Sequence, residues 1–216
     1  MAADAGRAEH VEPAGRSGDG ADDPQEVFDL INEDDVVIGR VRRGEAHQDP
    51  SLLHRSVQVL VLGGDGRLLL QRRSRRKDLF PGYYCASASG HVMAGEWYAE
   101  TAVREIEEEL GIAPPLTYLG KTLVRSDCET EMTQVFLARS DGPFRFHPGE
   151  TEGGLFLTRA ELRRARGAGS LPLTPALLAA LDILDGQAPD PDPSADGQSE
   201  RASQVECVDL GSEGEE

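Results

Sequence analysis

The chain has 216 residues, of which 38% are apolar, and its 39 acidic side chains outnumber the 22 basic ones, for a formal charge of −17. A net-acidic chain repels the phosphate backbone, which argues against a general DNA-binding protein, and no apolar run reaches the ~18 residues of a membrane-spanning helix. The first 20 residues lack the apolar core of a signal peptide, and Cys85, Cys128 and Cys207 form no close pair, so we expect a cytoplasmic protein with reduced thiols.

Acidic residues are concentrated at the two ends of the chain. Residues 1–24 contain six acidic residues and two Arg, and residues 187–216 contain nine acidic residues and one Arg, so the ends carry −12 of the total charge. Neither end contains an aromatic residue, and such segments bury too little apolar surface to offset the entropy lost on ordering. We therefore predict disordered tails at 1–24 and 187–216 and one folded domain at 25–186.

The first half of this domain predicts two β-hairpins followed by a further strand. The expected strands are 27–31, 36–41, 56–62, 67–72 and 83–89. The first two flank the turn residues 32–35, and the next two flank Gly63–Gly66, so each pair is expected to form a hairpin. The fifth strand follows the turn at Pro81–Gly82.

The second half predicts a long helix, three strands and two further helices. They are expected at 97–110 (helix), 118–125, 131–138 and 155–157 (strands), from 158 (helix) and at 175–185 (helix). Gly111 is a typical residue after a helix, Thr158 and Glu161 form a capping box, and Thr174-Pro175 is a typical helix start. Strands outnumber helices, so we predict an α/β (α+β) fold in which helices sandwich a mixed sheet.

The helix expected at 97–110 places three carboxylates on one face. At about 100° per residue, Glu105, Glu108 and Glu109 share one arc, next to the apolar arc of Ala102, Val103, Ile106 and Leu110. Adjacent carboxylates repel one another, and the C-terminal half of a helix disfavours anions. A bound Mg²⁺ or Mn²⁺ would offset both effects, whereas the alternative is a solvated acidic surface.

The spacing around these acids favours the metal site. It matches the Nudix box, G-x5-E-x7-R-E-U-x-E-E-x-G-U, at Gly90, Glu96, Arg104, Glu105, Ile106, Glu108, Glu109, Gly111 and Ile112. The chain therefore resembles the Nudix hydrolases, which cleave a small-molecule diphosphate using Mg²⁺ or Mn²⁺. The resemblance implies that Glu108 and Glu109 bind metal with the Gly90 carbonyl, and that Glu105 is a further ligand or the base. Arg104 would hold a box glutamate in place, so the predicted catalytic residues are Glu105, Glu108 and Arg104.

A second resemblance concerns residues outside the box. His47, His54, His91, Glu129 and Glu131 are similar to the metal ligands of type 1 isopentenyl-diphosphate isomerases, which share the Nudix fold. The same pattern continues through Arg55, Arg73 and Lys77, which it implies are substrate-binding residues. Three imidazoles and two carboxylates would suit Mn²⁺, Mg²⁺ or Zn²⁺. Taken singly, each His is more simply a packed or surface residue, and the basic run at 72–77 a solvated loop.

Two positions depart from the isomerase pattern. Ser89 stands where the isomerases have a catalytic Cys, and Ala176 stands where they have a Trp. On a straight strand Cys85 would lie about 13 Å from Ser89. We therefore predict a hydrolase acting on a nucleoside di- or triphosphate or a related diphosphate. An isopentenyl-diphosphate isomerase and a catalytically silent ligand-binding module are the alternatives. No membrane or DNA partner is expected, and a homodimer is compatible with the sequence.

Overall fold

The computed structural model describes residues 9–11, 23–147 and 149–187. The strands are β1 (Glu9–Val11), β2 (Val27–Ile31), β3 (Val37–Arg42), β4 (His54–Leu62), β5 (Arg67–Arg73), β6 (Tyr84–Cys85), β7 (Ala88–His91), β8 (Leu116–Arg125), β9 (Thr130–Arg139) and β10 (Thr151–Thr158). The helices are α1 (Arg43–Ala46), α2 (Tyr98–Leu110), α3 (Arg159–Ala168) and α4 (Pro175–Gly186). Among these, none has the length and apolar character that a membrane crossing requires.

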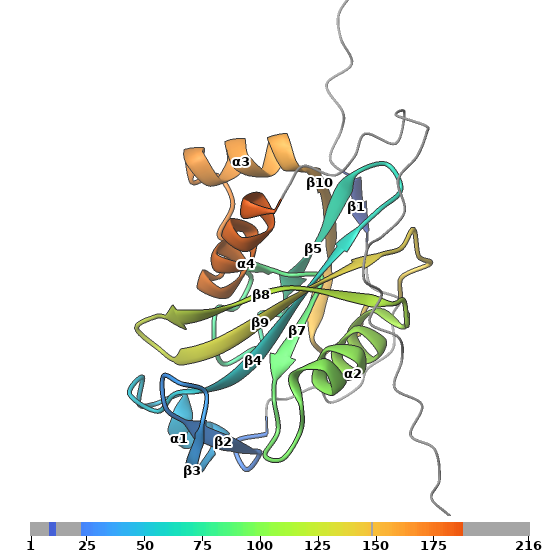
Figure 1. Ribbon diagram of the computed structural model, residues 1–216. Coiled ribbons are helices and arrows are strands. Elements are labelled where there is room, and N and C mark those ends of the chain that lie inside the picture. The colour runs from blue at the N-terminus through green and yellow to red at the C-terminus, as the bar shows by residue number, and fades with distance from the viewer. Residues whose placement is uncertain (1–8, 12–22, 148, 188–216) are drawn as a thin grey trace, which may run out of the picture.

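The main sheet is mixed and lies between helices. Its strands follow the order β1-β10-β5-β4-β9-β8, with β6 beside β5 and β7 beside β4. The β4–β9 pair is parallel, and the other pairs are antiparallel. Helix α2 covers one face and α3 and α4 lie on the other, while β2 and β3 form a separate two-stranded sheet (Figure 1). The predicted fold class is confirmed.

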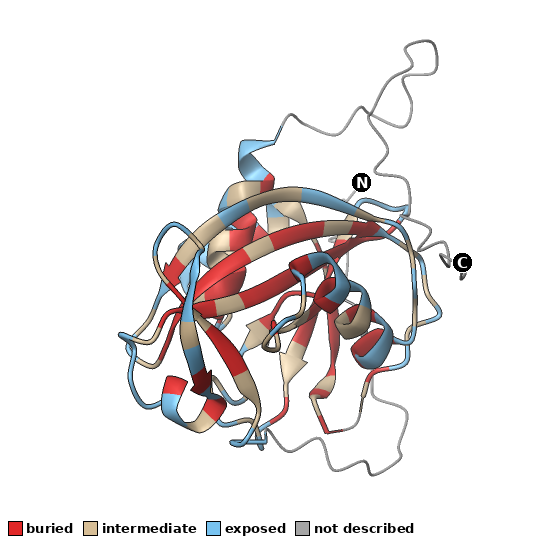
Figure 2. Cartoon of the chain, turned by 60° about the horizontal axis from the view of Figure 1, so that its bottom comes forward, coloured by how far each residue is buried: buried red, intermediate tan, exposed pale blue. Residues whose placement is uncertain are grey.

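Strand β4 is the centre of the core because both of its faces are covered. Val57, Val59 and Val61 pack in the cluster on the α2 side, and Leu60 and Leu62 pack in the cluster under α4. A strand buried on both faces has a nearly continuous apolar run, as this one does. Buried residues accordingly run through the central strands in Figure 2.

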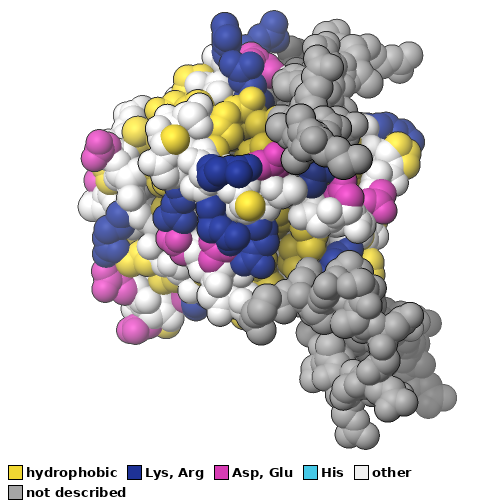
Figure 3. All heavy atoms as spheres, turned by 90° about the horizontal axis from the view of Figure 1, so that it is seen from above, with side chains coloured by type: hydrophobic (Ala, Val, Ile, Leu, Met, Phe, Trp, Pro, Cys, Tyr) yellow, Lys and Arg dark blue, Asp and Glu magenta, His cyan; other side chains and the backbone are white. Residues whose placement is uncertain are grey.

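Helix α3 forms part of the face shown in Figure 3, where basic side chains lie among acidic ones. Arg159 and Arg163 pair with Asp185 of α4, and Arg166 pairs with Asp182. These arginines therefore join two helices, and they do not form a patch of one sign.

Three features differ from the expected elements. The strand expected at 83–89 is divided, because β6 pairs with β5 and β7 pairs with β4. Helix α1 was not predicted. Residues 9–11, inside the first predicted tail, pair as β1 with the edge strand β10, and such backbone pairing needs no apolar side chains. Apart from residues 23–24 and Gln187, the rest of the predicted tails lies outside the described residues.

Candidate active site

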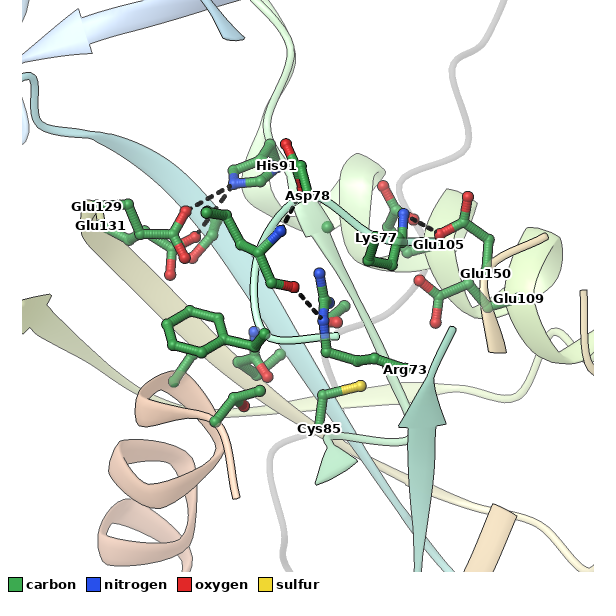
Figure 4. Close-up of a pocket in the computed structure, with 18 of the residues that line it drawn as sticks. Arg73, Lys77, Asp78, Cys85, His91, Glu105, Glu109, Glu129, Glu131 and Glu150 are labelled. Carbon is green, nitrogen blue, oxygen red and sulfur yellow. Dashed lines mark hydrogen bonds and ion pairs between the residues drawn. The ribbon is translucent and has the colours of Figure 1, made fainter. Parts of the chain in front are cut away.

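A cleft of about 470 Å³ opens where β4 and β5 separate. Strand β4 pairs with β5 only at Val61 and Leu62, and it pairs with β7 at residues 56–59. The cleft is lined from this gap, from α2 and from the start of α4. Figure 4 shows two groups of side chains in it, one around Glu105 and Glu109 and one around His91, Glu129 and Glu131.

Helix α2 directs its acids into the cleft because its apolar face is held in the core. Ala102, Ile106 and Leu110 are fully buried, and Gly111, with φ 66°, ends the helix in the left-handed conformation that glycine favours. The neighbouring face therefore places Glu105 and Glu109 at the cleft wall. Glu108 lines its edge, with 59% of its side chain exposed.

Arg104 ties the predicted box residues together. Its guanidinium donates to Glu105 Oε1 at 2.7 Å, to Glu108 Oε2 at 3.3 Å and to Glu96 Oε2 at 3.1 Å. It also donates to the His91 carbonyl at 3.4 Å. Arg104 therefore contacts three glutamates of the box, and its role in orienting them stays a prediction.

The buried acids of α2 favour their protonated forms when no cation is present. Burial raises the pKa of Glu105 to about 7, although Arg104 opposes the shift. Burial, and then the charges of Glu105 and Glu150, raise the pKa of Glu109 well above its usual value. The Gln71 amide donates to Glu109 Oε2 at 2.6 Å. A hard divalent cation fits this oxygen-rich group, because it would offset the cost of burying these charges and the repulsion between them.

Gly90 lets the Glu105 carboxylate lie close to the β7 backbone. A Cβ atom at this position would overlap that carboxylate. Any other residue would therefore displace the Glu105 side chain from its place in the cleft.

The second group contains three imidazoles. Ligand atoms of His47, His54, His91 and Glu129 all lie within 4.8 Å of one another. His47 Nδ1 lies 2.8 Å from Asp78 Oδ2, and His54 Nδ1 lies 3.0 Å from the Leu52 carbonyl. These contacts orient the rings as outer partners do in metal sites. None of the three Nε2 atoms makes a hydrogen bond with a residue that the structure describes.

His54 and His91 are in the neutral form that binds metal. Burial lowers the pKa of His54 to about 4 and that of His91 well below its usual value. Glu131 Oε1 lies 3.4 Å from His91 Nε2, and burial, followed by the charge of Glu129, raises the pKa of Glu131 to about 8. Neutral nitrogens beside carboxylates fit a transition metal or Mg²⁺.

Arg73 lies between the two groups (Figure 4), where its Nε donates to the Leu79 carbonyl at 3.1 Å. Lys77 forms an ion pair with Glu150. Sequence reasoning missed Glu150, which comes from the loop before β10, and it missed Arg43 and Asp78. None of these three belongs to a local motif, so only the fold reveals that they line the cleft.

Arg55 does not join the predicted site. It lies on the face of β4 opposite His54, and it is absent from the cleft lining. Its guanidinium donates to Asp35 Oδ1 at 2.6 Å and to the Asp35 carbonyl at 2.7 Å, and it lies over the Tyr98 ring. The alternation of side chains along a strand explains the difference, because neighbours point to opposite faces.

Cys85 lies closer to Ser89 than a straight strand would place it. The chain bends between β6 and β7, so both residues line the cleft, and the Cys85 thiol donates to the Gln71 carbonyl at 3.8 Å. Burial raises the pKa of the Cys85 thiol to about 11. The thiol is therefore protonated and weakly nucleophilic at neutral pH.

Comparisons with known proteins agree on one family. The NUDIX domain profile matches residues 52–177. An uncharacterized Nudix hydrolase of Pseudomonas aeruginosa, PA4841, is 36% identical over 159 residues, covering 73% of this chain and 92% of that protein. An isopentenyl-diphosphate Delta-isomerase of Nocardia farcinica is 32% identical over 163 residues, covering 73% and 93%. The crystal structure of DR0079 from Deinococcus radiodurans matches with a TM-score of 0.63 at 30% identity, covering 74% of this chain and 98% of that one.

Proposed function

Since the chain belongs to the Nudix family, as one of its hydrolases, we propose that it cleaves the diphosphate bond of a nucleoside di- or triphosphate or a related small molecule, using Mg²⁺ or Mn²⁺. The observation that carries this proposal is the pair of acids Glu105, which is partly buried, and Glu109, which is buried; they face one cleft with raised pKa values. Such a pair is poorly stable without a cation. The third box acid, Glu108, lies beside them.

The residues that line the cleft would have different roles in hydrolysis. A cation held by Glu105, Glu108, Glu109 and the Gly90 carbonyl would neutralise developing charge and acidify a water molecule. Arg104 and Gln71 hold the carboxylates of Glu105 and Glu109 in place. Arg73 and Lys77 lie where they can bind phosphoryl oxygens. Glu105 would act either as a further ligand of this cation or, where it leaves the cation to Glu108 and Glu109, as the base that accepts a proton from water.

We also propose that the histidine-rich group, with Glu129 and Glu131, holds a second divalent ion. Three converging Nε2 atoms without a hydrogen bond to any described residue support this. Metal analysis of the purified protein is the direct measurement. Two equivalents per chain are expected.

Isomerisation of isopentenyl diphosphate is the second candidate. The histidine-rich group, and the presence of Cys85 in the cleft beside Ser89, favour it. The protonated Cys85 and the small Ala176 count against it, as does the complete set of box acids. A silent binding module would need none of those acids.

A substrate panel tests the proposal. The protein is incubated with Mg²⁺ or Mn²⁺ and nucleoside di- and triphosphates, and phosphate and diphosphate release are measured. Isopentenyl diphosphate is included, and its isomer is analysed separately. Release from at least one nucleotide is expected, whereas an isomerised product without release from any compound would reverse the ranking.

A further inference from the structure

Gln58 carries a buried acceptor that the protein leaves unused. Its side chain lines the cleft, the residue is only 5% exposed, and Oε1 accepts no hydrogen bond from the described residues. A buried carbonyl oxygen without a donor is costly, so such atoms in native proteins call for an explanation. Gln71, the other buried glutamine of the cleft, donates to the Ser87 carbonyl and to Glu109, each at 2.6 Å.

The sheet register places Gln58 deep in the cleft. It lies on the same face of β4 as His54 and Ser56, opposite Ser89 of β7. Two residues further along β4, Leu60 belongs to the core under α4. Gln58 therefore lies between the histidine-rich group and α4, four residues or about 13 Å along the strand from His54.

This end of the cleft contains neutral groups. The lining residues that surround Gln58 through β6, β7 and the start of α4 are Cys85, Ser89, Thr174, Pro175 and Ala176. Of the charged groups, Arg73 of β5 lies beside Cys85, and the carboxylates and the other basic side chains come from α1, α2, β9 and the loops at the other end. A diphosphate requires the charged end, so the neutral end is left for the organic group that the diphosphate carries. The small side chain of Ala176 leaves space for that group.

We propose that Gln58 determines substrate specificity, by accepting a hydrogen bond from an N–H or O–H of a polar organic group joined to the diphosphate, such as a nucleobase. A hydrocarbon chain would leave Oε1 unpaired and would be disfavoured. The inference rests on the proposed diphosphate chemistry, and it adds the class of group that the substrate carries beyond its phosphates.

The test uses Gln58→Leu and Gln58→Met, which keep the size of the side chain and remove the amide. Gln134→Leu is the matched control. Gln134 lies on the neighbouring strand β9, where it pairs with Val57, and it is outside the cleft lining. Binding of UDP, CDP, ADP, GDP and isopentenyl diphosphate is measured by calorimetry with Ca²⁺, and hydrolysis is measured with Mg²⁺. Thermal melting of each variant is recorded alongside.

We expect the wild type to bind at least one nucleotide tenfold or more tightly than isopentenyl diphosphate. Both Gln58 variants should reduce this preference by about tenfold, through weaker nucleotide binding, since a single hydrogen bond contributes about that factor. Gln134→Leu should preserve the preference. Gln58→Leu should melt no lower than the wild type, because it removes an unpaired acceptor.

The outcomes separate this inference from the proposed function. An unchanged preference in the Gln58 variants, no nucleotide binding by the wild type, or a Gln58→Leu protein that melts well below the wild type would overturn the role of Gln58. Altered preference without hydrolysis of any compound would support Gln58 and overturn the hydrolase. Hydrolysis of a nucleotide with an unaltered preference in the Gln58 variants would support the hydrolase and overturn the role of Gln58.

Discussion

The two groups of proposed metal ligands in the cleft differ in construction and in charge. The acids of α2 come from one helix, within five residues of sequence, and Arg104 holds two of them. The histidine-rich group comes from the segment after α1 and from β4, β7 and the turn before β9. Of the described residues, the histidine-rich set brings its ligand atoms within 4.8 Å of one another, and the α2 acids are not gathered to that degree. One group consists of carboxyl groups held by a cationic side chain, whereas the other is compact and contains three imidazoles.

The largest expected effect comes from the helix group. Glu109→Gln should lower kcat by at least ~10²-fold, because it removes a charge from the proposed cation site while keeping the shape of the side chain. Initial rates on the best nucleotide measure it. Glu107→Gln is the matched control, since Glu107 is exposed on another face of α2, and it should retain the wild-type rate. Full activity in Glu109→Gln would mean that other groups hold the cation.

The histidine group should respond independently. His54→Ala should weaken one of the two metal equivalents by about 10- to 100-fold, because it removes one nitrogen of a converging set. Titration with Mn²⁺, followed by metal analysis, gives the result. Glu109→Gln should retain the equivalent that His54→Ala loses. Loss of the same equivalent in both variants would show that the two groups form one site.

The stability of the metal-free protein and that of the Mg²⁺-bound protein should depend differently on pH. The pKa of Glu105 rises from 4.5 to about 7 and that of Glu131 from 4.5 to about 8 in the fold, whereas the pKa values of His54 and His91 fall below 6.5. Below about pH 6.5 the histidines oppose the effect of the carboxyl groups, but above it the folded protein binds protons that the unfolded chain has lost. The free energy of unfolding of the metal-free protein should therefore fall as pH rises from about 6.5 to about 8, lowering Tm by about 5 °C. Excess Mg²⁺ should restore Tm most at the upper pH, since it replaces those protons. A metal-free Tm that is constant or rises over this range would contradict these shifts.

The smallest effect on catalysis is expected at Arg55. Arg55→Met should leave KM within about twofold, while it destabilises the protein by about 1–2 kcal/mol through loss of the partner of Asp35. Arg73→Met, in the cleft, should raise KM by about tenfold. Urea unfolding and substrate titration measure the two properties. A raised KM in an Arg55→Met protein of wild-type stability would show that Arg55 does contribute to substrate binding.

What could be predicted from the sequence depended on how local each signal was. The α2 acids are one helix turn apart, so their shared face followed from helical periodicity alone. Arg55 adjoins His54, and only the register of β4 decides which of the two faces the cleft. Glu150 and Asp78 reach the cleft from loops that carry no pattern, and β6 and β7 separate because each has a different neighbour in the sheet.

Strand β4 serves both sides of the sheet at once. Its odd-numbered valines pack against α2, while Ser56 and Gln58 line the cleft and the buried His54 belongs to the histidine-rich group beside it. Deleting or inserting a single residue early in this strand would exchange the two sets, placing polar groups in the core and valines in the cleft. An insertion or deletion in β4 would therefore disrupt the core. Changes of specificity in this strand are expected to come from substitutions at the even-numbered positions that line the cleft.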